Sequence, residues 1–145
     1  MFLGRTRKKI RFASVFSSLF FLAVPGLGAT WITGYYSAQN GVLPAAAIPW
    51  EYYSHIVHFA AAPGLDSNRN GNGTIALNYL TQAEIDQLVA SRPPGKKLLV
   101  CVKDNDHNLK AFAQATTPSR LPDFVRNITS FVSRNGYDGV DIDWE

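Results

Sequence analysis

Residues 138–145 have the sequence DGVDIDWE, which holds four of the 11 acidic residues of the chain. Three of these acids, Asp141, Asp143 and Glu145, alternate with apolar residues. A β-strand projects every second side chain on the same face, so a strand here would align the three carboxylates. Like charges on one face repel one another, and proteins keep such groupings where a proton must be held or moved. The octapeptide therefore predicts a strand that carries a cluster of catalytic acids.

Three further runs have the composition of strands, and helical patterns separate the later ones. These strand runs are residues 31–37, 55–61 and 97–102. The last two are almost entirely apolar, which is typical of parallel strands covered on both faces. One helix is expected after Thr81, which forms a capping-box pattern with Glu84, and a second over about residues 119–134. This alternation indicates βαβ units and an α/β fold.

The first 29 residues have the pattern of a targeting segment. Five basic residues precede residue 12, an apolar run follows from Phe12 to Val24, and small residues come next. The run is about 13 residues long, which suits a signal peptide, whereas a bilayer span needs roughly 20. We therefore expect a signal peptide over residues 1–29 and secretion of the remainder, with a retained membrane anchor as the alternative. Without the five basic residues the net charge of +3 becomes negative, so nucleic-acid binding is not expected.

Residues 30–145 are expected to hold one domain, with no cofactor and no metal. The single cysteine, Cys101, excludes an intrachain disulfide and lies in an apolar run. No grouping of His, Cys and acidic residues has metal-ligand spacing. Residues 66–74 begin like a calcium-binding loop, but Leu77 stands where such a loop needs its bidentate glutamate. We interpret this segment as a turn-rich surface loop.

Two segments match the N-glycosylation sequon, in which asparagine is followed two residues later by threonine or serine. They are Asn72-Gly73-Thr74 and Asn127-Ile128-Thr129. Such matches are frequent by chance and matter only in a eukaryotic host.

The segment DGVDIDWE resembles the D-x-x-D-x-D-x-E signature of glycoside hydrolase family 18, the chitinases and related endo-N-acetylglucosaminidases. That signature lies on the fourth strand of a TIM barrel. Residues 32–37 (ITGYYS) and 55–60 (HIVHFA) are similar to the first and second strands of the family. The resemblance implies a (β/α)8 barrel, of which this chain supplies the N-terminal half, about four β/α units.

The resemblance also implies a substrate-assisted retaining mechanism and a role for each acid. Glu145 would be the general acid and later the base. Asp143 would bind the 2-acetamido group of the substrate, which itself attacks the anomeric carbon, and Asp141 would share a proton with Asp143. Asp138 has the opposite parity and would support the beginning of the strand, and Tyr35 would contact Asp141 from the first strand.

The sequence departs from the family at the end of the third strand. The common pattern there is S-x-G-G, whereas this chain has Cys101-Val102-Lys103-Asp104. A thiol donates a weaker hydrogen bond than a hydroxyl, so Cys101 would support Asp141 less firmly. Lys103 would stand near the cleft, where it could pair with an acid or a substrate oxygen. Trp144 has the parity of the helix layer, so we expect it in the core.

The implied partners are chitin or N-acetylglucosamine oligosaccharides. Two alternatives stay open: an endo-β-N-acetylglucosaminidase acting on N-glycans, and a sugar-binding pseudoenzyme, against which the presence of Glu145 argues. A TIM barrel needs eight strands, and four are recognised here. We therefore expect the chain to be the N-terminal part of a longer secreted hydrolase and to be inactive by itself.

Overall fold

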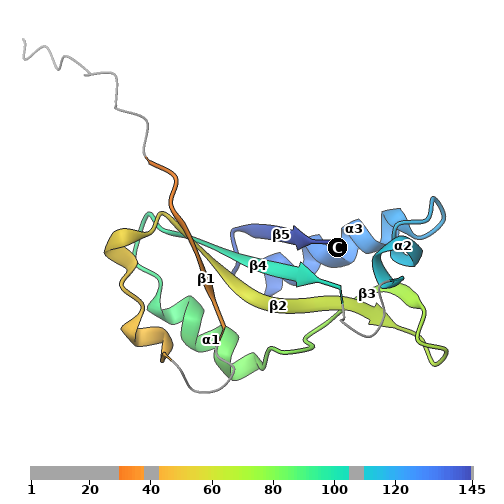
Figure 1. Ribbon diagram of the computed structural model, residues 1–145, viewed down its shortest axis with the longest axis horizontal. Coiled ribbons are helices and arrows are strands. Elements are labelled where there is room, and N and C mark those ends of the chain that lie inside the picture. The colour runs from red at the N-terminus through yellow and green to blue at the C-terminus, as the bar shows by residue number, and fades with distance from the viewer. Residues whose placement is uncertain (1–29, 38–42, 105–109, 145) are drawn as a thin grey trace, which may run out of the picture.

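The structure is a computed structural model that describes residues 30–37, 43–104 and 110–144 (Figure 1). The predicted signal peptide over residues 1–29 and the predicted general acid Glu145 lie outside these ranges. Within them, no helix has both the length and the apolar character needed to cross a bilayer.

Four parallel strands form a sheet with the order β1-β2-β4-β5. Their bounds are β1 (Thr33–Tyr36), β2 (His55–Leu65), β4 (Lys97–Lys103) and β5 (Gly139–Asp143). Each contains part or all of one of the expected strand runs. The parallel arrangement confirms the predicted α/β fold and is that of the N-terminal strands of a (β/α)8 barrel.

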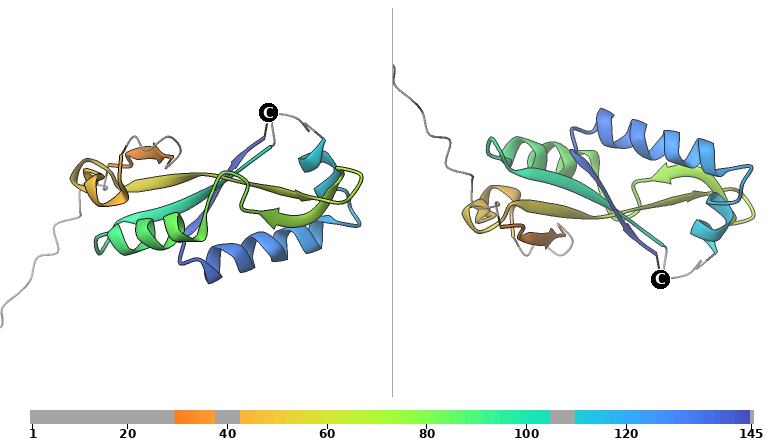
Figure 2. Two further views of the ribbon diagram at one scale, coloured as in Figure 1. Left: turned by 90° about the horizontal axis from the view of Figure 1, so that it is seen from below. Right: turned by 90° about the horizontal axis from the view of Figure 1, so that it is seen from above.

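Helices α1 (Gln82–Ser91) and α3 (Leu121–Arg134) connect the later strands, and both lie on the same side of the sheet (Figure 2). The capping box that begins α1 is formed: Thr81 Oγ1 accepts from the Glu84 amide at 3.3 Å, and a Glu84 carboxylate oxygen accepts from the Thr81 amide at 2.7 Å. Between β1 and β2 the chain makes two short 3₁₀ turns, η2 (Ala45–Ala47) and η3 (Trp50–Tyr52).

Two elements were not expected, a strand β3 (Gly71–Ala76) and a short helix α2 (Ala111–Ala115). Strand β2 continues four residues past Ala61 and pairs with β3 in an antiparallel hairpin. The interpretation of residues 66–74 as a loop is therefore wrong from residue 71 onward. Asparagine and glycine are rare in strands, but hydrogen bonds from the helices hold this one. The Gly71 amide donates to Gln114 Oε1 at 2.6 Å, and Asn127 Nδ2 donates to the Gly73 carbonyl at 2.8 Å.

The sheet buries apolar side chains on both faces. On the helix side, alternate residues of β2 and β4 pack against α1 and α3. The strands contribute Ile56, Leu98 and Val100, and the helices contribute Ile85, Leu88 and Phe131. Beyond them, Val102 packs with Phe112 and Phe124 under the hairpin. The opposite face buries a smaller cluster of Val57, Ala60 and Cys101. Burial on both faces explains why β2 and β4 are almost continuously apolar.

One polar side chain, His58 of β2, is fully buried on the helix side. Its Nδ1 lies 2.8 Å from the hydroxyl of Tyr137. Burial lowers the pKa of His58 to about 4, against a smaller opposing effect of the Glu84 carboxylate. The imidazole is therefore neutral in the folded protein over most of the accessible pH range.

We expect the free energy of unfolding to fall as the pH is lowered from 6.5 to 4. In that window the unfolded chain binds a proton on His58, which titrates there near 6.5, while the folded chain does not. At about 1.4 kcal/mol for each unit of pKa difference, the loss is about 3 kcal/mol. Urea unfolding of the chain at several pH values measures it. The variant His58→Gln, which does not titrate, should give a flatter profile; an equal slope in both proteins would contradict the assignment.

Candidate active site

Asp141 and Asp143 lie on the face of β5 that points away from the helix layer. The residue before Asp141, Val140, packs against the core clusters of the helix side, so the two acids project to the opposite face. In the register of β4 with β5, Asp141 lies beside Cys101 and Asp143 beside Lys103. The structure thus places the two acids on one face at the carboxyl end of a parallel strand, where (β/α)8 barrels hold their catalytic groups.

The hydroxyl of Tyr35 donates a hydrogen bond to Asp141 Oδ2 at 3.2 Å. Tyr35 is in β1 and Asp141 is in β5, the two edges of the four parallel strands. In a flat sheet the two edge strands would be about 14 Å apart, since neighbouring strands lie about 4.8 Å from each other. The hydrogen bond therefore requires a curved sheet whose concave face holds the acids. Tyr35 itself is 64% exposed on this face.

Cys101 lies beside Asp141 on the neighbouring strand β4 and is fully buried. Desolvation raises the pKa of the thiol to about 12, and the charge of the Asp141 carboxylate and a hydrogen bond to it add to the increase. The group is therefore a protonated thiol beside Asp141. The structure thus brings Cys101 next to Asp141, as expected from the sequence.

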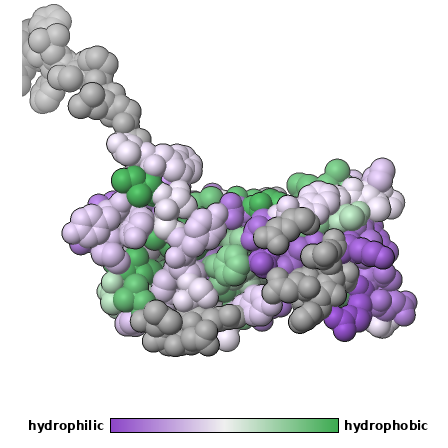
Figure 3. Space-filling model, viewed as in Figure 1, coloured by the Kyte–Doolittle hydropathy of each residue, from purple (hydrophilic) through white to green (hydrophobic). Residues whose placement is uncertain are grey.

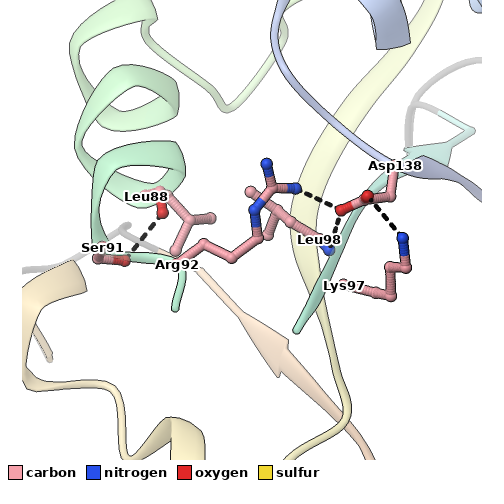
Figure 4. A network of polar contacts seen from close by, with 6 residues as sticks. All are labelled: Leu88, Ser91, Arg92, Lys97, Leu98 and Asp138. Atoms are coloured by element: carbon pink, nitrogen blue, oxygen red, sulfur yellow. Dashed lines mark hydrogen bonds and ion pairs between the residues drawn. The ribbon is translucent and has the colours of Figure 1, made fainter. Parts of the chain in front are cut away.

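Asp138 is not among the acids of the concave face but lies at the other end of β5 (Figure 4). Its carboxylate accepts a hydrogen bond from the Leu98 amide at 2.9 Å, lies 3.1 Å from Lys97 Nζ, and forms an ion pair with Arg92. Its own amide donates to the Leu98 carbonyl at 2.7 Å. Desolvation alone would raise the pKa of Asp138, but the Leu98 amide and the two cations outweigh it and lower the pKa. Asp138 thus joins the beginning of β5 to the beginning of β4 and to the end of α1.

Two further residues near the acids were noted in the sequence, Lys103 and Trp144. Lys103 Nζ lies 5.6 Å from the centre of the Phe59 ring, a cation–π contact at the end of β4. Trp144 is on the helix side, as its parity predicts, and stacks on Phe112 of α2 with ring centres 5.4 Å apart. It is 52% exposed, however, so the expectation of a core position is only half met.

Sequence reasoning did not find Arg92 and Lys97 as partners of Asp138. Nothing in the sequence distinguishes these two cations from others. Only the fold brings the end of α1 and the beginning of β4 next to Asp138. Across the described ranges, no group of three or more His, Cys, Asp or Glu side chains could hold a metal ion.

Parallel strands whose carboxyl ends carry acids on a concave face define the chain as part of a (β/α)8-barrel protein. The family profile described as "Glycosyl hydrolases family 18" matches residues 31–145. The chain therefore belongs to glycosyl hydrolases family 18. A sequence search among curated proteins found no match.

Solved structures with the same fold include chitinases from plants and fungi. A class V chitinase from Nicotiana tobaccum is 17% identical, with a TM-score of 0.60 over 78% of this chain and 32% of that protein. A chitinase from Rhizomucor miehei is 24% identical, with a TM-score of 0.60 over 78% of this chain and 33% of that protein. A chitinase variant of Cycas revoluta in complex with (GlcNAc)4 is 16% identical, with a TM-score of 0.65 and coverages of 78% and 33%. The chain thus spans about a third of the length of these structures.

We expect the substitution Asp138→Asn to destabilise the fold by about 2 kcal/mol at pH 7, since hydrogen bonds to a charged group contribute about 1.5–3 kcal/mol. The difference from the wild type should shrink as the pH falls through the lowered pKa of Asp138, because the wild-type carboxylate then loses its charge. Urea unfolding at pH 7 and pH 3 measures both quantities.

The matched control is Asp123→Asn, which also removes an aspartate–arginine pair. That pair, with Arg126, lies on the surface of α3, and the Asp123 side chain is 61% exposed. Exposed pairs contribute about 0–1 kcal/mol, so this variant should unfold close to the wild type. Equal destabilisation by the two variants would contradict a special role for Asp138.

We also expect the Cys101 thiol to resist alkylation in the folded protein. The thiolate is the reactive form, and a buried thiol with a pKa of about 12 supplies almost none of it at pH 8. Iodoacetamide should therefore modify the folded chain at least about 100-fold more slowly than the chain in urea. The chain has one cysteine, so mass spectrometry reports this site alone. Similar rates in both conditions would show that the thiol is open or ionised.

Proposed function

We propose that this chain forms the acid-bearing part of a glycoside hydrolase that cleaves β-1,4-linked N-acetylglucosamine polymers, of which chitin is the main example. The observation that carries the proposal is the Tyr35–Asp141 hydrogen bond on the concave face of the sheet. This bond and the register beside Cys101 tie Asp141 of β5 to two other strands, β1 and β4. Membership of glycosyl hydrolases family 18 supplies the class of reaction.

The proposed mechanism uses the 2-acetamido group of the substrate as the nucleophile. Glu145 protonates the glycosidic oxygen while the acetamido oxygen attacks the anomeric carbon and the leaving sugar departs. Asp143 accepts a hydrogen bond from the acetamido N–H and orients it for this attack. Water, deprotonated by Glu145, then opens the cyclic intermediate from the other face. Two displacements at the anomeric carbon leave its configuration retained.

Asp141 serves in this proposal as the inner partner of Asp143. It accepts a hydrogen bond from Tyr35 and lies beside the Cys101 thiol of β4. In this proposal the two carboxyl groups share one proton. The proton can move toward Asp141 when Asp143 must accept a hydrogen bond from the substrate. Tyr35 and Cys101 are thus positioning residues, because they act on the substrate through Asp141.

The mechanism requires an N-acetyl group next to the scissile bond, which fits chitin and also the alternative substrate, N-glycans; the solved complexes favour chitin. Two of the solved structures with this fold, from Nicotiana tobaccum and Cycas revoluta, are complexes with NAG4 and (GlcNAc)4. We further propose that residues 1–29 direct the protein out of the cell, where chitin is found.

The 145-residue chain alone is proposed to be inactive. Four parallel strands leave the concave face open, as the exposure of Tyr35 shows, and acid catalysis of this kind needs a site from which water is excluded. Activity is expected from a protein that joins this chain to the remaining strands of the barrel.

In that longer protein, Glu145→Gln should lower the rate of cleavage of a fluorogenic chitotrioside by about 100-fold to 10,000-fold, the usual contribution of a general acid. Tyr35→Phe should cost about tenfold, since it removes one hydrogen bond to a charged group. Chitin binding, measured by co-sedimentation, should persist in both variants, and Asp123→Asn should leave the rate unchanged.

Retained cleavage by Glu145→Gln would exclude the mechanism. If the longer wild-type protein binds chitin but does not cleave it, the sugar-binding pseudoenzyme is favoured. Turnover by the 145-residue chain would show that four strands are enough.

A further inference from the structure

The two N-glycosylation sequons lie next to each other in the folded chain, one in β3 and one in α3. Asn127 of α3 donates its side-chain N–H to the carbonyl of Gly73, the middle residue of the other sequon, at 2.8 Å. Glycosylation attaches a sugar to the side-chain nitrogen of asparagine, so the surroundings of that atom decide whether the folded protein tolerates the sugar. The two asparagines differ sharply in this respect.

Asn127 has its nitrogen engaged between α3 and β3. The side chain is half-buried, and its contact to Gly73 joins the helix to the hairpin. A sugar on Asn127 Nδ2 would have to fit between the helix and the strand, which would separate them.

Asn72 has its oxygen engaged instead. Its Oδ1 accepts hydrogen bonds from the amide of Thr74 at 2.9 Å and from the hydroxyl of Thr74 at 2.6 Å. Within the described part of the chain, Asn72 Nδ2 makes no hydrogen bond, and the side chain is exposed. The nitrogen that would carry the sugar is therefore the end of this side chain that the fold does not use.

The absence of a side chain at Gly64 makes this arrangement possible. A Cβ atom at Gly64 would lie 1.9 Å from Thr74 Oγ1 and 3.0 Å from Asn72 Oδ1. The side chains of Asn72 and Thr74 thus cover Gly64 of β2 on the outer face of the hairpin. The hairpin end of the molecule is also where hydrophilic residues gather in the space-filling view (Figure 3). A glycan here would extend from a surface that is already hydrated.

We propose that Asn72 is an N-glycosylation site of this chain, and that Asn127 is not, whenever the chain enters a compartment that transfers oligosaccharides from a lipid carrier. In the reaction, Asn72 Nδ2 forms a bond to the anomeric carbon of an oligosaccharide linked to a lipid diphosphate. The bond between that carbon and the diphosphate oxygen breaks, the lipid diphosphate leaves, and Nδ2 loses one proton. The inference concerns the hairpin and is independent of the proposed hydrolase activity.

The test is expression of the full chain in yeast behind a secretory leader that functions there, so that delivery does not depend on residues 1–29. Recovery of the protein from the medium establishes delivery. The wild type should carry one glycan, detected as a mobility shift that endoglycosidase H removes and as a tagged peptide in mass spectrometry. Asn72→Gln should abolish the glycan, and Asn127→Gln should leave it in place.

A second measurement separates the two asparagines by their structural roles. Asn127→Gln should lower the midpoint of thermal unfolding, because it loses the contact to Gly73, whereas Asn72→Gln and enzymatic removal of the glycan should change it little. A secreted wild type without a glycan would overturn the proposal. So would a glycan on Asn127, seen as a shift that persists in Asn72→Gln.

Discussion

The pairing of Asp138 with Leu98 is the contact on which the site depends most. It joins the beginnings of β5 and β4 through both the backbone and the side chain, and Arg92 and Lys97 hold the carboxylate charged. The register that follows places Asp141 beside Cys101 and Asp143 beside Lys103. A slip of one residue would turn both acids into the helix layer, since side chains alternate along a strand. The first acid of the signature thus has a structural task, and the proposed chemistry is assigned to the later ones.

Curvature of the sheet is the second condition, because a correct register alone would leave Tyr35 and Asp141 too far apart. The helices α1 and α3 cover one face only, and the larger core cluster forms there. The acids are left on the concave face, where Asp141 accepts a hydrogen bond from Tyr35 and lies beside Cys101. The curvature of the sheet therefore accompanies both the apolar packing on the helix side and the polar contacts on the concave face.

The main strands and both long helices could be predicted from local patterns. The apolar runs at 55–61 and 97–102 and the capping box at Thr81 each carry their own signal. The contact of Tyr35 with Asp141 was reached only through resemblance to a family, because the two residues are 106 positions apart. Strand β3 and the cations that hold Asp138 could not be predicted. Their positions depend on packing and ion pairs between distant segments, which composition and periodicity do not record.

The length of β2 has a consequence for how such a protein can diversify. Its first half belongs to the parallel sheet, and its second half pairs with β3, where Gln114, Arg120 and Asn127 hold the hairpin from the helices. The turn at residues 66–70 is thereby anchored on both flanks and remains outside both pairings. Insertions at this turn would lengthen the hairpin while the acids of β5 keep their places. Because both flanks of this turn are fixed, its length and sequence can change without disturbing the sheet, and such changes would alter what this surface binds.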